Sequence, residues 1–359
     1  MVARGFVQME GDAPPFAGKR AVTIKDVAAV AQVSRATAAR ALNGYGYVGG
    51  AAAERVREAA ERLGYRGNRI AQALRQGQMP IIGFVPGDIQ NPFFARIAHD
   101  VDIELRRSRR SLLIASSEED PVQEREILDN LRALNVRGMI VAPASGEDNP
   151  HLIRLVQEGM PLVLIDRVAA GVPCDSITVD NEGGAHEAVA YLVANGHRRI
   201  ALIHDDSRIA TARERLAGYA RCLAENDITV EDRLIAVSQS TVEHAIDATI
   251  RLFSQPERPT ALFTVDSLMT TGALLALRTM GLSVPQDVSL VGFDDFDLAT
   301  FTDPQITVVA QPVAQIGPLA VKMLLDRIRG SDEPPRSTRF ATRLIVRGSV
   351  AHPDFGRHR

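Results

Sequence analysis

The chain has 359 residues, of which 45% are hydrophobic and 24% charged, so its composition is that of an ordinary globular protein with room for two or three domains. No apolar run reaches the roughly 18 residues that a membrane span needs, and residues 1–20 lack the apolar core of a secretory signal peptide. The two cysteines, Cys174 and Cys222, are far apart in sequence. We therefore expect a cytoplasmic protein with two reduced thiols.

The formal net charge of −3 hides a strong asymmetry along the chain. Residues 19–75 contain eleven Lys or Arg and four acidic residues, a net charge of +7, so the remainder carries −10. This pattern favours a polyanion-binding module attached to an acidic body with another task. A merely solvated basic face is the alternative.

Three short helices are predicted between Thr23 and Tyr65. Thr23 with Asp26 predicts the start of the first helix, and glycines at 44 and 46 separate the second from the third. The first and third helices each place apolar residues at i, i+3, i+4 and i+7. These residues are Ile24, Val27, Ala28 and Ala31 in the first helix, and Val56, Ala59, Ala60 and Leu63 in the third.

The second helix of this module is predicted to begin after Ser34, a favourable N-cap residue. Its inward face comprises Ala38, Ala41 and Leu42. The opposite face is predicted to present Arg35, Ala36, Ala39, Arg40 and Asn43.

Two tight helices, a short turn and a bracing third helix form a helix-turn-helix, whose second helix can enter the major groove of DNA. Arg35 and Arg40 can bridge guanine O6 and N7, while Thr37 and Asn43 suit phosphate or sugar. A three-helix interaction domain is the alternative, and the charge of +7 favours DNA.

The stretch "VTIKDVAAVAQVSRATAARALNG", followed by "YV" and "ERLGYRGNRIAQALRQG", resembles the DNA-binding head of the lac-repressor (LacI/GalR) family. The resemblance implies that Arg35, Ala36 and Arg40 read bases and that Thr37 and Asn43 contact the DNA backbone. It also implies further DNA contacts at Thr23, Ser34, Tyr65 and Asn68.

This head departs from the family pattern in three places. Ala39 replaces a serine, which removes a phosphate contact; residues 49–53 replace a better-capped start of the third helix; and Gly67 replaces a proline. Residues 69–76 form at most a short helix, ended by Gly77 and Pro80, and by composition they are a linker.

The resemblance gives this linker a sharper interpretation, as a hinge helix that folds on DNA. It implies that Leu74 wedges into the minor groove with Ala71 beside it, and that Arg75 lies next to phosphates.

From residue 81 short apolar strands alternate with amphipathic helices, which indicates parallel sheets covered by helices. The predicted strands are 81–85, 112–115, 139–142, 162–165, 177–179, 200–203, 234–237, 261–264 and 289–292. The predicted helices include 95–107, 122–134, 184–195, 213–225, 245–253 and 268–280. Nine strands are too many for one small sheet, so two doubly wound lobes are predicted.

Ligands of such sheets bind beyond the carboxyl ends of the strands, where this sequence has many aspartates. Carboxylates accept hydrogen bonds from adjacent hydroxyls, and Phe93 and Phe94 can cover an apolar ring face. The pattern favours a sugar, a polyol or a nucleobase-like ligand. Helix caps and turn residues are the alternative for each aspartate taken alone.

Segments such as "IIGFVPGDIQNPFFARI", "PLVLIDR", "RERLAGY" and "SLVGFDD" extend the resemblance to the family's ligand-binding domain, which is similar to periplasmic sugar-binding proteins. The resemblance implies that Arg215 clamps the polar groups of the ligand, with Arg213 as a competitor for this role. The implied ligand-binding residues are Phe93, Phe94, Asp166, Arg215, Asp266 and Asp294.

The expected fold is therefore α/β, an all-α helix-turn-helix head followed by a two-lobed, periplasmic-binding-protein-like domain of doubly wound parallel sheets. Residues 1–20 are expected to be a disordered extension, 21–68 the head, 69–79 the hinge, 80–350 the ligand-binding and dimerisation domain, and 351–359 a tail. The resemblance implies crossings between lobes near Asp180, residues 307–310 and Phe340. Lobe 1 then spans about 80–179 and 310–339, and lobe 2 about 180–309 and 340–350.

The expected function is a transcriptional regulator, a repressor whose affinity for a pseudo-palindromic operator is controlled by a small effector. The tail has no leucine heptads, so a homodimer is expected. The effector could be a hexose, a sugar acid, a sugar phosphate or a purine. Because no lysine cluster suggests a phosphate, a neutral sugar or a sugar acid is favoured.

Two other functions are compatible with parts of the sequence. An enzyme is disfavoured, because the sequence contains no P-loop, HExxH, GxSxG or clustered Cys/His motif, and no cofactor is expected. Isolated histidines such as His99, His151 and His244 are expected at the surface. An extracytoplasmic solute-binding protein explains the two lobes but leaves the basic head unexplained.

Overall fold

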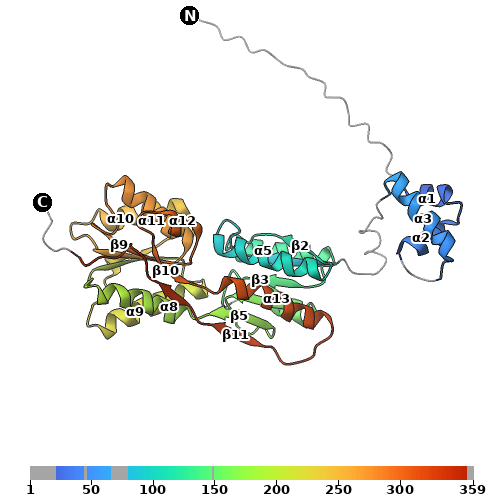
Figure 1. Cartoon of the computed structure of the whole chain (residues 1–359). Coiled ribbons are helices and arrows are strands. Elements are labelled where there is room, and N and C mark those ends of the chain that lie inside the picture. The colour runs from blue at the N-terminus through green and yellow to red at the C-terminus, as the bar shows by residue number, and fades with distance from the viewer. Residues whose placement is uncertain (1–21, 44–46, 66–79, 148, 354–359) are drawn as a thin grey trace, which may run out of the picture. The chain divides into compact units, whose positions relative to one another are not determined.

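The computed structural model describes residues 22–43, 47–65, 80–147 and 149–353. The chain divides into two compact units, Met1–Gly77 and Gln78–Arg359. The first is all-α and the second is built from parallel sheets covered by helices (Figure 1). The predicted fold class is confirmed.

The first unit contains helices α1 (Ile24–Val30), α2 (Arg35–Asn43) and α3 (Gly50–Leu63). The Asp26 carboxylate accepts hydrogen bonds from the backbone N–H and the hydroxyl of Thr23, at 2.8 and 2.7 Å, which fixes the start of α1. The three helices pack around a small core of mainly alanine and valine. Its buried members are Val27, Ala28, Ala31, Ala38, Val56, Ala59 and Ala60.

Ala39 does not share the exposure of its predicted neighbours on α2. Only 9% of Ala39 is exposed, whereas Arg35, Ala36 and Arg40 are exposed. The prediction that Ala39 lies on the outer face is therefore wrong. It sits at the edge of the inward face, beside Ala38, and so it is covered when the three helices close around their core.

The second unit contains two sheets with the same arrangement of strands. The order in the first is β11 (Ser337–Phe340), β5 (Asp175–Val179), β4 (Leu162–Asp166), β3 (Met139–Val141), β1 (Ile81–Val85), β2 (Ser111–Ile114). The order in the second is β12 (Arg343–Ile345), β10 (Thr307–Ala310), β9 (Ser289–Phe293), β8 (Ala261–Thr264), β6 (Ile200–His204), β7 (Ile235–Val237). All neighbouring strands are parallel except β10 and β12.

Helices cover both faces of each sheet, and each sheet with its helices is one lobe (Figure 1). Successive strand residues point to opposite faces, so Phe84 packs in the core beneath α5 and α13 while Val85 packs beneath α6 and α7. Helices of the first lobe are α5 (Pro92–Arg107), α6 (Pro121–Ala133), α7 (Pro150–Gln157) and α13 (Val313–Ile328). Helices of the second lobe are α8 (Asn181–Ala194), α9 (Ala210–Glu225), α10 (Val242–Phe253), α11 (Ser267–Thr279) and α12 (Asp297–Phe301).

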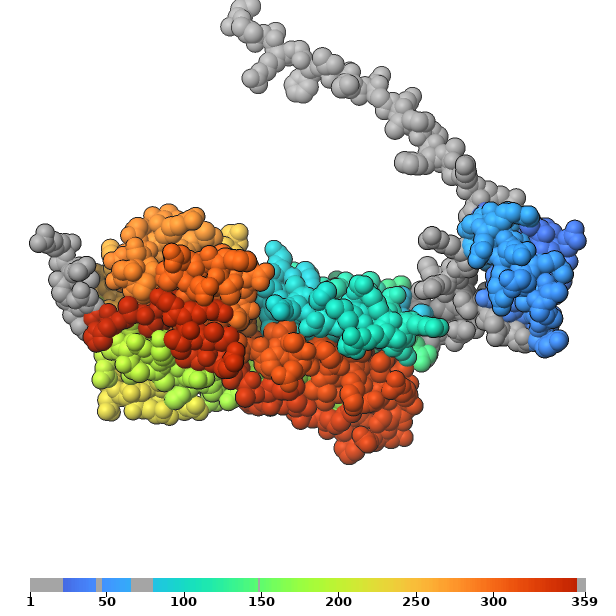
Figure 2. Space-filling model, in the orientation of Figure 1, coloured from blue at the N-terminus to red at the C-terminus, as the bar shows by residue number. Residues whose placement is uncertain are grey.

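The chain passes between the lobes three times, from β5 to α8, from β10 to α13 and from β11 to β12. Figure 2 shows the red C-terminal part of the chain on the surface of both lobes. A unit joined by three short crossings can change the angle between its lobes without unfolding either one.

Three strands and three helices of this unit were not predicted, namely β10, β11, β12, α7, α12 and α13. The short strands β11 and β12 are half-exposed at sheet edges, so they lack the apolar run of a buried strand. Helix α13 contains Gly317 and Pro318, which interrupt a helical pattern in sequence.

His151 differs from its expected surface position. Only 4% of His151 is exposed, and its Nε2 lies 2.6 Å from Oε1 of the fully buried Glu124. The other carboxylate oxygen of Glu124 accepts a hydrogen bond from the backbone N–H of Ala144, at 2.6 Å. The histidine is thus part of the packing between α6 and α7, while His99 and His244 are exposed as predicted.

Candidate functional site

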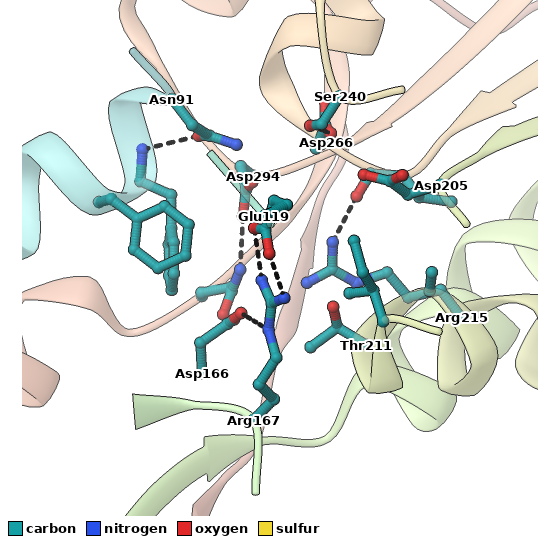
Figure 3. A pocket seen from close by; sticks show the side chains of 16 residues that line it. Asn91, Glu119, Asp166, Arg167, Asp205, Thr211, Arg215, Ser240, Asp266 and Asp294 are labelled. Carbon is teal, nitrogen blue, oxygen red and sulfur yellow. Dashed lines mark hydrogen bonds and ion pairs between the residues drawn. The ribbon is translucent and has the colours of Figure 1, made fainter. Parts of the chain in front are cut away.

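A cleft lies between the lobes, at the carboxyl ends of the strands of both sheets (Figure 3). The lining residues are Asn91, Phe93, Phe94, Glu119, Asp166, Arg167, Asp205, Ile209, Thr211, Ala212, Arg215, Ser240, Val265, Asp266, Asp294 and Gln311. The free volume at its centre is only about 40 Å³, and an adjoining groove of about 380 Å³ continues towards solvent. A ligand larger than a few water molecules therefore needs the side chains or the lobes to move.

The start of α5 forms the aromatic wall of the cleft. The Asn91 side chain caps this helix by accepting a hydrogen bond from the backbone N–H of Phe93, at 3.0 Å. The rings of Phe93 and Phe94 then pack edge to face, with centroids 5.0 Å apart. Ser267, at the start of α11 in the other lobe, also donates to Asn91 Oδ1, at 3.0 Å. One amide oxygen thus positions the aromatic wall and joins the lobes.

An ion-pair network from the first lobe occupies the centre of the cleft (Figure 3). The Arg167 guanidinium donates to both oxygens of Glu119, at 2.6 and 2.9 Å, and to Asp166, at 3.0 Å. Burial nevertheless raises the pKa of the Glu119 carboxyl above its ordinary value. A Cβ at Gly87 would overlap the Glu119 carboxylate, so glycine leaves room for this network.

Arg215 on α9 lies over the ring of Phe293, with the guanidinium carbon 3.8 Å from the ring centroid. Its Nε donates to Asn181 Oδ1, at 2.9 Å, and one terminal nitrogen donates to the carbonyl of Val265. Only 6% of Arg215 is exposed. Arg213 instead lies outside the lining residues, half-exposed, with a terminal nitrogen bonded to the carbonyl of Ser207.

Asp294 and Asp266 are two buried carboxylates of the second lobe. Burial raises the pKa of Asp294 to about 6, although Arg215 and a hydrogen bond from Gln311 oppose the shift. Burial also raises the pKa of Asp266, against hydrogen bonds from the backbone N–H of Met269 and the Ser240 hydroxyl. Both groups hold a proton more readily than a solvated aspartate does.

Asp205 follows strand β6 and is half-buried. Burial, together with the charges of Asp266 and Glu119, raises the pKa of Asp205 to about 7. The cleft therefore contains a carboxyl group that changes its charge near neutral pH. The cleft lining is acidic as a whole, with five acidic side chains and two arginines. Asp205 is the acid among them whose pKa lies close to neutral pH.

The DNA-binding residues predicted in the head lie mostly on its surface. Thr23, Ser34, Arg35, Ala36 and Arg40 are exposed. The Ser34 hydroxyl accepts a hydrogen bond from the backbone N–H of Thr37, at 3.0 Å, so the predicted cap of α2 is present.

Thr37 and Tyr65 are half-buried, and Tyr65 packs against the core of the head. Asn43 is the last residue of α2. Asn68, Ala71, Leu74 and Arg75 lie outside the described residues.

Within the ranges that the structure describes, no helix combines the length and apolar character needed to cross a bilayer. In the same ranges, no group of three His, Cys, Asp or Glu side chains is placed to hold a metal ion.

Comparison with known proteins places both units. A family model described as "Bacterial regulatory proteins, lacI family" matches residues 23–68, and one described as "Periplasmic binding protein-like domain" matches residues 189–350. The chain is 32% identical to the HTH-type transcriptional repressor CytR of Escherichia coli (strain K12), over 92% of this chain and 96% of the relative. The chain belongs to the lacI family of bacterial regulatory proteins.

Solved structures agree with this membership. The structure of the lac repressor dimer bound to operator and the anti-inducer ONPF is 26% identical, with a TM-score of 0.80, and the match covers 92% of this chain and 100% of that chain. The complex of the transcriptional regulator CelR with cellobiose is 30% identical, with a TM-score of 0.68, and the match covers 91% and 99%. The interpretation as a DNA-binding transcriptional regulator is confirmed over that of a solute-binding protein.

All six ligand-binding residues predicted from the sequence line one cleft of this lacI-family protein. The most important additions are Glu119, Arg167, Asp205 and Gln311. Arg167 and Asp205 lie two residues beyond the predicted strands 162–165 and 200–203. Their position at the carboxyl ends of strands is thus a sequence signal for the cleft. Glu119 lies in a loop and Gln311 follows a strand that was not predicted, and neither carried a sequence signal of its own.

Proposed function

We propose that this regulator is a repressor that binds operator DNA through its head and a small sugar-like effector in the cleft between its lobes. The observation that carries the proposal is the position of the cleft. Buried Arg215 and the carboxylates of both lobes meet between two sheets that three crossings connect. An effector bound there contacts both lobes and favours one angle between them.

The surface of α2 supports the proposed DNA contacts. Arg35 and Arg40 are exposed on the helix that follows the turn, where guanidinium groups can bridge guanine O6 and N7. We propose that Ala36 faces bases between them and that Thr23, Ser34, Thr37, Asn43 and Tyr65 contact the DNA backbone. Asn68, the last residue of the proposed head, is proposed to add a further contact. The proposed hinge contacts of Ala71, Leu74 and Arg75 complete the interface.

The acceptors and the aromatic wall of the cleft support a ligand with several hydroxyl groups. Phe93 and Phe94 can cover a ring face, while Asp294 and Arg215 can bind hydroxyls from the second lobe. Two similar solved structures are complexes with small ligands, CelR with cellobiose and the lac repressor with the anti-inducer ONPF. We assign weaker contacts to Asp166 and Asp266.

We further propose that the protein acts in the cytoplasm as a homodimer without enzymatic activity. A dimer places two heads on two half-sites, so the operator is pseudo-palindromic. Effector binding and DNA binding are then coupled reciprocally, because the effector changes DNA affinity by the factor by which DNA changes effector affinity.

Selection of genomic fragments by the full-length protein tests this proposal. The expected result is a small set of related pseudo-palindromic fragments whose binding weakens steeply as salt concentration rises. A hexose panel added to the selected complex then gives the sign of the coupling, and turnover of the bound sugar is not expected. Absence of binding to any fragment at low ionic strength would overturn the proposal.

A further inference from the structure

The charges that line the cleft do not balance. Five carboxylates, those of Glu119, Asp166, Asp205, Asp266 and Asp294, surround the two guanidinium groups of Arg167 and Arg215. When all are ionised the lining carries a net charge of −3, and much of it is buried. Charge buried without a partner is costly, so a bound ligand that supplies positive charge is favoured.

Five of the six guanidinium nitrogens of the two arginines already donate to protein groups. Arg167 directs Nε and both terminal nitrogens at Asp166 and Glu119. Arg215 directs Nε at Asn181 and one terminal nitrogen at Val265, which leaves the other terminal nitrogen for a ligand. An anionic ligand would have to displace carboxylates from Arg167, which makes the cleft a poor binding site for anions.

Acceptors, in contrast, remain available. Gln311 is only 9% exposed, and its Oε1 has no hydrogen-bond partner among the residues that the structure describes. Its Nε2 donates to Asp294 Oδ1, at 2.6 Å, which fixes the orientation of the amide and directs Oε1 away from that carboxylate. A buried acceptor in the cleft lining without a partner calls for a donor from a ligand.

The adjoining groove has the same bias. Its acidic residues are Asp88, Glu118, Glu119, Asp120, Asp205 and Asp206. Among the described residues that line it, Arg208 is the one basic residue, and its Nε donates to Asp206, at 3.0 Å. Clefts lined by one sign of charge concentrate ligands of the opposite sign, so the approach to the cleft also favours a cation.

We propose that the cleft takes a small polyhydroxylated ligand that carries a protonated amino group, and that it discriminates against sugar acids and sugar phosphates. This inference rests on the proposed effector function and narrows its ligand class. Hydroxyl groups alone could satisfy Gln311 and the carboxylate oxygens, but they would leave the excess negative charge in place. An ammonium group supplies both the donors and the charge.

Sugars that share a hexose ring and carry a positive, neutral or negative group test the proposal on the full-length protein at neutral pH. Thermal shift and calorimetry compare glucosamine, galactosamine and mannosamine with the three parent hexoses, with glucuronate and galacturonate, with glucose 6-phosphate, and with calcium chloride alone. At least one amino sugar is expected to bind about tenfold more tightly than its parent hexose, and the anions not to bind. A parent hexose that binds as tightly, an anion or calcium that binds best, or no binding by any amino sugar overturns the proposal.

Two matched variants locate the effect. Asp205→Asn removes a carboxylate from the cleft and is expected to reduce the preference for the amino sugar over its parent about tenfold. Asp129→Asn makes the same substitution on the surface of α6, where the Asp129 side chain is 52% exposed, and is expected to leave the preference unchanged. Equal effects of the two variants contradict the assignment.

A DNA readout separates failure of this inference from failure of the proposed function. Binding to the selected genomic fragment is measured in the same samples. If the fragment binds and only neutral or anionic sugars change its affinity, the proposed ligand class is wrong, while the proposed function as a regulator is supported. If no fragment binds, the proposed function itself fails.

Discussion

Asp166 and Asp294 occupy equivalent places in the two lobes. Asp166 ends β4 and Asp294 directly follows β9, and these are corresponding strands of the two sheets. Both residues have positive φ angles, 68° and 77°, in the left-handed region that few residues other than glycine adopt. Both side chains are buried in the cleft. Each lobe thus holds one carboxylate in the cleft by means of a strained backbone conformation.

Replacing Asp294 with asparagine is expected to stabilise the protein while it weakens ligand binding. The folded-state pKa of Asp294 is about 6, above the ordinary value of 3.8, so the folded state binds more protons than the unfolded state between these values. Stability that is present at low pH is therefore lost as the pH rises through about 6. Asparagine avoids this cost, keeps an acceptor for Gln311 and tolerates the positive φ, so we expect a gain of about 2 kcal/mol in unfolding free energy at about pH 8.

Urea denaturation of the wild type and of Asp294→Asn across pH measures this gain. The difference in unfolding free energy between wild type and variant is expected to become small at about pH 4. At that pH the Asp294 carboxyl is protonated in the folded wild type and partly protonated in the unfolded wild type. A variant that is less stable than the wild type at about pH 8 would show that the charge of Asp294 supports the fold instead of opposing it.

Arg215 is held at the point where the chain enters the second lobe. Its partner Asn181 is the first residue of α8, directly after the crossing from β5. Arg215→Lys loses the planar donor set and is expected to weaken effector binding about a hundredfold. Asn181→Ala leaves the guanidinium in place but frees its Nε, so a loss of about tenfold is expected.

Calorimetry with the effector found in the sugar panel measures both losses. Arg213→Lys is the matched control, because Arg213 is half-exposed and does not line the cleft. A larger loss of effector affinity for Arg213→Lys than for Arg215→Lys would show that Arg213, and not Arg215, binds the polar groups of the effector.

The sequence was sufficient for the class and arrangement of the fold because burial leaves a strong pattern. Apolar runs such as residues 81–85 and 261–264 predicted parallel strands, and counting them predicted two sheets. Edge strands such as β11 were not predicted, because their side chains alternate between half-buried and exposed and lack an apolar run.

The candidate site was predictable only where chemistry follows a strand end. Asp166 and Asp294 could be found in this way, and Arg215 came from the resemblance to a family. The pairing of Arg167 with Glu119 could not be predicted from the sequence. The two residues are 48 positions apart and meet only after β2 and β4 have entered the same sheet. Side-chain pairing across a sheet leaves no local signal in one sequence.

In the head, the arginines of α2 are expected to matter more for DNA than an arginine of α3. Arg35→Ala and Arg40→Ala are each expected to weaken binding to the selected fragment by about 1–3 kcal/mol and to relax its sequence preference. Arg57→Ala removes the same charge from α3, where Arg57 pairs with Glu54 at 2.7 Å, and is expected to have a smaller effect. Fluorescence anisotropy with wild-type and mismatched fragments measures both quantities, and equal losses for all three variants would indicate binding by net charge alone.

Asp175 anchors the edge strand β11 to the first lobe, and its loss is expected to destabilise that lobe. The fully buried carboxylate accepts hydrogen bonds from Arg327, at 2.7 and 3.1 Å, and from the side chain and backbone N–H of Arg336, at 2.8 and 2.7 Å. Hydrogen bonds from Arg327 and Arg336 outweigh burial and lower the pKa of Asp175 to about 2, so this stabilisation is complete above the ordinary value of 3.8 and is lost as the pH falls through about 2.

Asp175→Asn leaves two arginines without their shared charge and is expected to cost about 3 kcal/mol at neutral pH, measured by urea denaturation. Asp332→Asn, an exposed change in the loop before β11, should cost less than about 0.5 kcal/mol, and a similar cost for both would mean that the loop and not the ion pair holds the strand.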